Sequence, residues 1–328
     1  MYTAKENRYE NMQFNYCGNS GLKLPMISLG LWHNFGYGSS FQNMENMCHT
    51  AFDNGITVFD IANNYGAPEG AAEESFGKIL SNGFIQYRDE MIITTKAGYY
   101  MHKGPYGDWG SRKYLISSLN ASLKRLGIDY VDIFYHHRYD PNTPMEETAY
   151  ALKQIVDSGK ALYVGISNYN KEQTMQMANL LKESHTPFII NQIRYSIFDR
   201  TIEENGLKDY ASKHGIGLTT FSPLAQGLLT DRYLNGIPKD SRIITDGRFL
   251  HEKDVNDKLE KIKKLNEIAQ SRGQSLAQMA LSWILRDGDI TSVLIGASSP
   301  EQIIDNLGIL HAPKFTAEEL QKIEEISK

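Results

Sequence analysis

The side chains best suited to proton chemistry lie at the ends of three apolar segments: Asp60, Tyr65, Lys96, His136 and His137. β-Branched apolar segments of this length are typical of buried parallel strands. A phenol has an ordinary pKa near ~10, and a neighbouring ammonium group lowers that pKa by stabilising the phenolate. Lys96, held by Asp60, could therefore make Tyr65 a proton donor near neutral pH. A neutral histidine beside Tyr65 could hydrogen-bond the same substrate oxygen.

A structural interpretation is open for each of these residues taken alone, because a lone lysine and aspartate pair at a strand end is more often structural than catalytic. Their joint placement at three consecutive strand ends favours chemistry, since the strands of a parallel β/α barrel end on one face. Such side chains move protons and cannot supply a hydride. A reduction at this site would therefore need a cofactor.

Eight apolar segments that alternate with helical patterns predict an α/β fold, a closed parallel (β/α)8 TIM barrel. The expected strands are residues 26–32, 58–61, 91–95, 131–135, 161–167, 188–191, 216–221 and 292–295. Residues 12–25 predict an N-terminal β-hairpin that plugs one end of the barrel. Helices are expected over 44–54, 71–82, 113–126 and 207–214, with extra C-terminal helices over 259–272, 276–286 and 317–326.

Helix boundaries follow from capping patterns. Thr143 is expected to cap a helix that starts at Pro144 and ends at Gly159, and Asn170 to cap the next one. The polar stretch 225–257 has the length of a functional loop.

Composition limits the classes of partner. The 328 residues are 41% hydrophobic with a net charge of −5, so neither nucleic acid nor an anionic membrane is an implied partner. We expect one domain over 1–328 with a tail at 1–11, and a small-molecule substrate. The two cysteines, Cys17 and Cys48, are too few for a disulfide framework and lack metal spacing, which predicts reduced thiols, no metal and a cytoplasmic location. No apolar run approaches the ~20 residues that span a bilayer.

The C-terminal third offers a surface for an anionic cofactor. Residues 296–299 lead into a helix that begins with Pro300, and free N–H groups at a helix start favour an anion. The alternative is that Ser299 and Gln302 simply form a capping box. Residues 222–228, after the seventh strand, are either a turn or a source of backbone donors to a pyrophosphate.

The chain resembles the aldo-keto reductases along residues 12–328. Its nearest branches there are the bacterial reductases of L-glyceraldehyde 3-phosphate and, next, the voltage-gated potassium channel β subunits. The segments that carry the resemblance are 29–36, 60–66, 95–99, 104–107, 131–135, 142–148, 159–168, 223–230 and 292–298. The resemblance implies that Tyr65 is the general acid, that Lys96 and Asp60 tune it, and that His137 orients the substrate. His136 then has a supporting or packing role.

The resemblance also implies a binding site for NADPH. Ser167, Asn168 and Gln192 would hold the nicotinamide carboxamide, and Phe221 would stack on the nicotinamide ring. The complete implied set is Trp32, Ser167, Asn168, Gln192, Phe221, Ser222, Leu224, Gln226, Gly227, Arg232, Arg242, Ser298, Gln302, Asp305 and Asn306. Of these, Ser298 and Gln302 would face the 2′-phosphate, and Asp305 and Asn306 the adenosine. Many family members carry arginine at the Gln302 position, and a neutral amide attracts a phosphate less strongly than a guanidinium.

The implied activity is NADPH-dependent reduction of small aldehydes, with L-glyceraldehyde 3-phosphate, giving glycerol 3-phosphate, and methylglyoxal as substrates and a homo-oligomer as the assembly. A substrate phosphate could meet one of four loop cations, which are otherwise solvated charges: Lys103, Arg112, Arg138 and Arg194. One alternative is a nucleotide-binding interaction module like the channel subunits, which carry asparagine at the His137 position. Another is a non-redox lyase or isomerase, which would need a metal cluster or a Schiff-base lysine without an acidic neighbour.

Overall fold

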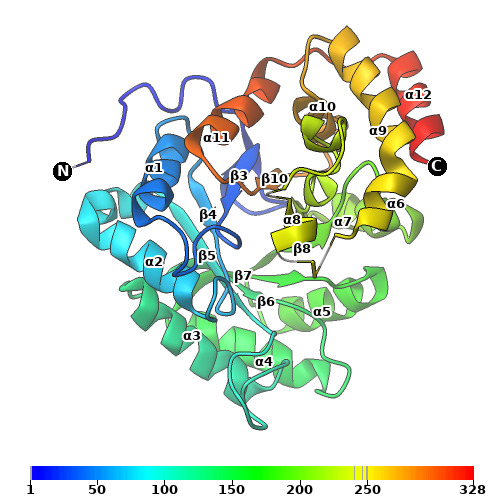
Figure 1. Ribbon diagram of the computed structural model, residues 1–328. Coiled ribbons are helices and arrows are strands. Elements are labelled where there is room, and N and C mark those ends of the chain that lie inside the picture. The colour runs from blue at the N-terminus through cyan, green and yellow to red at the C-terminus, as the bar shows by residue number, and fades with distance from the viewer. Residues whose placement is uncertain (1, 240, 246, 249) are drawn as a thin grey trace.

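Eight parallel strands close into a barrel with helices around the outside, in a computed structural model that describes residues 2–239, 241–245, 247–248 and 250–328 (Figure 1). Around the ring the strands are β3 (Ile27–Gly30), β4 (Val58–Asp60), β5 (Ile92–Ala97), β6 (Val131–His136), β7 (Ala161–Ser167), β8 (Phe188–Arg194), β9 (Gly217–Phe221) and β10 (Ser292–Ile295). The ring closes where Val293 of β10 pairs with Ile27 of β3. The predicted (β/α)8 barrel is therefore confirmed.

The predicted N-terminal hairpin is also present, as the antiparallel strands β1 (Phe14–Tyr16) and β2 (Lys23–Pro25). It covers the end of the barrel where the strands begin. The Asn19 backbone N–H donates to the Gly215 carbonyl at 2.9 Å, and the Asn15 side chain donates to the Thr291 carbonyl at 2.9 Å. The opposite end, where the strands finish, is left for the site.

The helices between the strands are α1 (Phe41–Phe52), α2 (Ala71–Ile79), α3 (Arg112–Leu126), α4 (Met145–Asp157), α5 (Lys171–Glu183), α6 (Thr201–Glu204), α7 (Leu207–His214), α8 (Arg242–Thr245), α9 (Glu252–Ser271) and α10 (Leu276–Ile284). Two helices follow β10, namely α11 (Pro300–Leu307) and α12 (Ala317–Ser327). None of the helices in the described ranges has both the length and the apolar composition needed to cross a bilayer.

Several predicted helix boundaries were wrong for local reasons. Thr143 does not cap α4; its hydroxyl donates to Asp140 Oδ2 at 2.6 Å, and Pro144 occupies the N-cap position. Helix α9 begins at Glu252 rather than 259, so the loop after β9 is shorter than predicted and contains α8. By contrast, the capping box of Asn170 and Gln173 at α5 is confirmed.

An apolar layer inside the barrel forms the floor beneath the strand ends. It includes Val58, Ile133, Tyr135 and Ile190. Gly165 makes room for this layer, since a Cβ there would lie 2.6 Å from the Tyr135 ring. Burial of these side chains is favourable at roughly 25 cal/mol per Å².

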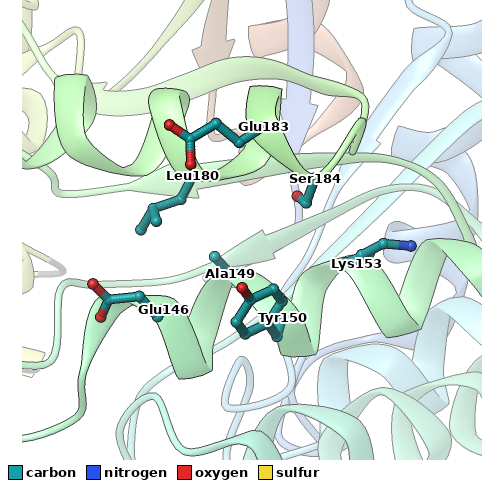
Figure 2. Close-up of a pocket in the computed structure, with 7 residues that line it drawn as sticks. All are labelled: Glu146, Ala149, Tyr150, Lys153, Leu180, Glu183 and Ser184. Atoms are coloured by element: carbon teal, nitrogen blue, oxygen red, sulfur yellow. The ribbon is translucent and has the colours of Figure 1, made fainter.

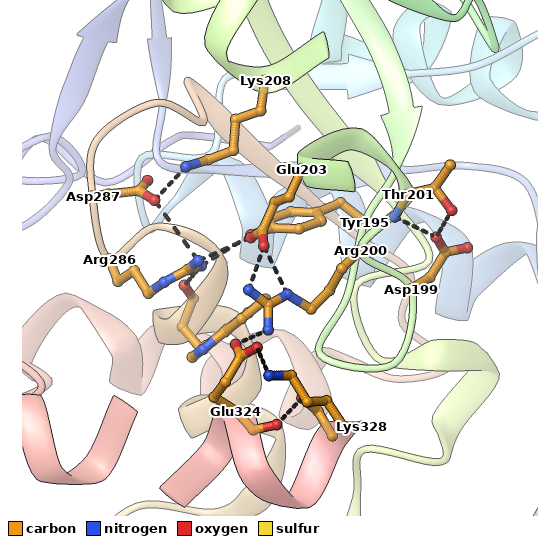
Figure 3. A network of polar contacts seen from close by, with 12 residues as sticks. Tyr195, Asp199, Arg200, Thr201, Glu203, Lys208, Arg286, Asp287, Glu324 and Lys328 are labelled. Atoms are coloured by element: carbon orange, nitrogen blue, oxygen red, sulfur yellow. Dashed lines mark hydrogen bonds and ion pairs between the residues drawn. The ribbon is translucent and has the colours of Figure 1, made fainter. Parts of the chain in front are cut away.

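The C-terminal helix α12 is tied to the barrel by a polar network (Figure 3). Arg200 pairs with Glu324 of α12 and with Glu203 of α6. Arg286, which follows α10, donates to Glu203 at 3.0 Å and to Tyr195 Oη at 3.0 Å. These contacts join α6, α12 and the segment before β10, which are far apart in the sequence.

Candidate active site

Lys96 and Asp60 form a buried ion pair at the ends of β5 and β4. Lys96 Nζ lies 2.5 Å from Asp60 Oδ2 and donates to the Ile61 carbonyl at 2.8 Å. Asp60 Oδ1 accepts from Thr94 Oγ1 at 2.7 Å and from Gln192 Nε2 at 2.9 Å. Because each carboxylate oxygen has a donor, the desolvation cost of this buried charge is offset and its orientation is fixed.

Tyr65 lies beside this pair, as predicted. Lys96 Nζ is 5.1 Å from the centre of the Tyr65 ring. The Tyr65 ring also lies 5.7 Å from His137 and 5.8 Å from Trp32, measured between ring centres. The structure therefore brings together all four residues of the predicted catalytic set.

The predicted direction of the Tyr65 pKa was wrong. Burial raises the pKa of Tyr65 well above its ordinary value, and the charge of Asp60 and the neighbouring Tyr99 raise it further. The physical reason is that burial penalises the phenolate, while the ammonium of Lys96 is already paired with the carboxylate of Asp60. Tyr65 is thus a protonated phenol at neutral pH and has a proton to give.

His137, rather than His136, faces Tyr65, as predicted. Burial lowers the pKa of His137 well below its ordinary value, and the charges of Lys96, His136 and Arg138 lower it further, so its imidazole is neutral. His136 points elsewhere: its Nδ1 lies 2.6 Å from Tyr169 Oη. Burial lowers the pKa of His136 to about 4.

Sequence reasoning missed two residues that support the site. Thr94 lies two residues before Lys96 on β5, so both side chains point to the same side of the sheet, and that period-two spacing was an available signal. Tyr99 lies edge-on to His137, with ring centres 4.7 Å apart, and no spacing rule pointed to it.

Ser167, Asn168 and Gln192 lie at the ends of β7 and β8. Asn168 has a left-handed backbone (φ +58°), and its Nδ2 donates to the His137 carbonyl at 3.0 Å and to Ser167 Oγ at 3.1 Å. Gln192 donates to Asp60. These residues therefore also hold the catalytic groups. Phe221 ends β9, and the Arg194 guanidinium lies 5.8 Å from its ring.

The segment after β9 has an unusual backbone. Ser222, Ala225, Gln226 and Gly227 have positive φ angles of 53°, 47°, 60° and 96°. Successive residues of this kind create concave backbone surfaces that suit anions. Gln226 donates to Ser222 Oγ at 3.1 Å, while the amides of Ala225 and Gly227 close local turns. Leu224 begins this bend, and Arg232 follows in a short 3₁₀ turn; the Arg242 side chain lies outside the described part of the chain.

The start of α11 is the second surface predicted for the cofactor. Ser299 caps α11 without a side-chain hydrogen bond to its backbone, and Gln302 Oε1 instead accepts from the Ser298 amide at 2.8 Å. The alternative interpretation, a capping box of Ser299 and Gln302, is therefore wrong. Asp305 is exposed and accepts from Gln278 Nε2 at 3.0 Å, and Asn306 is buried.

Both surfaces leave room for an anionic ligand. A Cβ at Gly296 would meet nothing within 4 Å, and one at Gly227 would meet only Tyr233 at 3.6 Å, so open backbone lies beside both segments. Such backbone at a helix start and a positive-φ turn suits phosphate groups.

A different groove, between α4 and α5, shares no residue with the strand-end site (Figure 2).

Two of the four loop cations considered for a substrate phosphate already have partners within the protein. Arg112 donates to Gln154 of α4. Arg138 donates to Asp108 at 2.7 Å and to the Gly98 carbonyl at 2.7 Å. Arg194, at the end of β8, is 56% exposed and has only a loose pairing with Asp199, at 4.0 Å. Lys103 is exposed on the loop after β5.

The fold is a closed parallel TIM barrel, and its strand ends carry a buried ion pair, a phenol and a neutral imidazole. This combination is the one expected of an oxidoreductase built on a TIM barrel. The chain belongs to the aldo/keto reductase family, whose model matches residues 26–328. It is 54% identical over 329 residues to "L-glyceraldehyde 3-phosphate reductase" of Escherichia coli (strain K12), covering 99% of this chain and 95% of that protein. The same identity and coverage hold for the protein of that name in Escherichia coli O157:H7. The family uses NAD(P)H to reduce aldehydes.

Proposed function

We propose that this chain uses NADPH to reduce L-glyceraldehyde 3-phosphate to glycerol 3-phosphate. The observation that carries the proposal is the arrangement of Tyr65 beside both the Lys96 and Asp60 pair and the neutral His137. The names of the two relatives support the choice of substrate, since they match nearly the whole chain.

In the proposed reaction, NADPH supplies the hydride when it is bound. Tyr65 donates its phenolic proton to the carbonyl oxygen as negative charge develops there. Lys96 then stabilises the phenolate, since its ammonium nitrogen lies 5.1 Å from the centre of the Tyr65 ring. His137, being neutral, donates an N–H hydrogen bond to the same oxygen and orients the substrate.

NADPH, rather than NADH, is favoured by the start of α11. Free backbone N–H groups there attract an anion, and Ser298 and Gln302 would face the 2′-phosphate. Gln302 is neutral, so the predicted preference for NADPH is smaller than with an arginine. Opening of the bond between Gln302 and the Ser298 amide would free both groups for that phosphate.

Arg194 is the cation that we propose for the substrate phosphate. It lies two residues beyond Gln192 on β8, so both side chains point into the barrel mouth. In the ring of eight, β8 lies four strands from β4, directly across the mouth from Tyr65. Its guanidinium can bind a phosphate in bidentate fashion.

The test is a panel of substrates with both nucleotides, measured as loss of absorbance of the reduced nucleotide. The panel contains L- and D-glyceraldehyde 3-phosphate, methylglyoxal and an uncharged aldehyde. We expect the highest kcat/KM with the L-phosphate and NADPH. Absence of turnover with every aldehyde would reject the proposal. Light scattering tests the proposed homo-oligomer, and cell fractionation tests the proposed cytoplasmic location.

A further inference from the structure

The loop that follows β5 folds closely over His137. A Cβ at Gly98 would lie only 2.9 Å from His137 Cβ, so glycine permits this approach. The next residue, Tyr99, presents its ring to His137 at 88°, with ring centres 4.7 Å apart. The Tyr99 carbonyl accepts from Tyr114 Oη at 2.5 Å. Tyr99 therefore forms one wall of the space around the imidazole.

Arg138 holds this loop through four contacts. Its Nε donates to the Gly98 carbonyl at 2.7 Å, and its Nη2 donates to Asp108 Oδ1 at 2.7 Å. Its guanidinium carbon lies 4.3 Å from the centre of the Tyr99 ring and 3.7 Å from that of Trp109. The planar guanidinium suits such a combination of stacking and directed hydrogen bonds, which an ammonium group does not reproduce.

The far end of the loop has a strained backbone. Trp109 has φ +71°, an uncommon conformation for a bulky residue, and its amide donates to Asp108 Oδ1 at 2.7 Å. The following Gly110 amide donates to Asp140 Oδ2 at 3.0 Å. Arg138 thus holds the start of loop 98–110 through Gly98, and Asp140 holds its end through Gly110. The strained conformation of Trp109 persists because Arg138 and Asp140 fix the residues on either side of it.

We propose that Arg138 is a positioning residue for His137. By clamping loop 98–110 it keeps Tyr99 against the imidazole, and so fixes the orientation of that ring toward the substrate oxygen. The inference rests on the proposed role of His137. The same contacts direct the guanidinium toward Gly98 and Asp108, so Arg138 does not act as the ligand of a substrate phosphate.

A double-mutant cycle tests whether Arg138 acts through His137. With saturating NADPH and an uncharged aldehyde, we expect Arg138→Ala to lower kcat by about 10- to 100-fold, because small misplacements at a reacting centre are costly. Arg138→Lys restores only part of that loss, since lysine lacks the planar fork. In a His137→Ala background, Arg138→Ala has an effect below about twofold, because there is no ring left to position.

The matched control is Arg112→Ala, which removes the first residue of α3, just after the loop, whose guanidinium donates to Gln154 of α4. We expect kcat to stay unchanged in this variant. A readout independent of turnover is the imidazole NMR signal of His137, assigned by its loss in His137→Ala. We expect this signal to shift in Arg138→Ala and to stay in place in Arg112→Ala.

Three results would overturn the proposal. The first is a loss confined to KM for phosphorylated aldehydes, which would make Arg138 a phosphate ligand. The second is an equal loss of kcat with and without His137, and the third is an unshifted His137 signal. If the wild-type protein reduces no aldehyde, the proposed function fails, and the NMR comparison still decides the role of Arg138.

Discussion

Tyr65 keeps its proton at neutral pH because its surroundings disfavour the phenolate before the reaction begins. Burial and the nearby Asp60 raise its pKa, and the Lys96 charge is already paired at 2.5 Å. His137 is neutral because burial and nearby cations disfavour the imidazolium. At the residue scale the site is thus prepared with one proton donor and one neutral hydrogen-bonding group.

The lowered pKa of His136 should make the free energy of unfolding depend on pH. Burial lowers its folded pKa from 6.5 to about 4, so below pH 6.5 the unfolded chain binds more protons than the folded one. Its contribution is therefore complete above pH 6.5 and is lost as pH falls toward 4, by up to about 3 kcal/mol at 1.36 kcal/mol per pKa unit. His137 contributes in the same direction.

Urea unfolding at pH 7 and pH 5 measures this effect. His136→Asn should show a smaller decrease in the free energy of unfolding between the two pH values, whatever its stability at pH 7. An unchanged decrease would contradict the assignment to His136.

If Arg194 binds the substrate phosphate, its removal should raise KM for phosphorylated aldehydes and leave KM for uncharged aldehydes unchanged. Arg194→Gln should raise KM for glyceraldehyde 3-phosphate by about 10-fold or more, because a charge-assisted pair is worth ~1.5–3 kcal/mol. KM for an uncharged aldehyde should not change. Lys103→Gln is the comparison, since Lys103 is an exposed loop cation. A larger effect of Lys103→Gln would move the phosphate site to the loop after β5.

At the scale of elements, strands β4, β5 and β8 jointly fix one carboxylate. Thr94→Val removes a hydrogen bond to buried Asp60 and should lower the free energy of unfolding by about 1.5–3 kcal/mol. Thr220→Val is a matched control, because Thr220 is also a buried strand threonine but its hydroxyl has no hydrogen-bond partner among the described residues. That variant should be neutral or stabilising in the same denaturant titration, and equal losses in both would contradict this account.

Arg272 fixes the position of α12 against α9. Its side chain is 2% exposed and pairs with Glu319 at 2.6 Å, donates to the Pro313 carbonyl at 2.6 Å, and lies 3.7 Å from the Phe315 ring. Arg272→Ala should lower the free energy of unfolding by about 1–3 kcal/mol, because it removes the hydrogen bonds to Glu319 and to the Pro313 carbonyl, while partly exposed Glu319 can be solvated by water. Lys322→Ala, which breaks an exposed pair with Glu318, should leave the midpoint of thermal unfolding almost unchanged, because water screens that pair.

At the scale of the whole molecule, closure of the sheet brings residues 60, 96, 137 and 192 to one end of the barrel. The sequence was enough to predict this, because a regular alternation of strands and helices places every strand end on one face. It also predicted the hairpin and the choice of His137 over His136.

Other features depend on tertiary contacts and could not be predicted. Burial of the Tyr65 phenol raises its pKa instead of lowering it, and the charge of Asp60 adds to this effect. Thr143 bonds to Asp140 instead of capping α4. The contacts of Arg138 with Tyr99 and Trp109 come from a loop without a repeating pattern, and side-chain direction in such loops follows from packing alone.

The measurement that tests the central claim most directly is kcat for NADPH oxidation by Tyr65→Phe at saturating L-glyceraldehyde 3-phosphate. The phenylalanine keeps the ring and removes only the proton donor. We predict a fall of at least about 100-fold relative to wild type, with unchanged affinity for NADPH in a fluorescence titration. A Tyr65→Phe enzyme that turns over at the wild-type rate would contradict the claim that Tyr65 protonates the substrate.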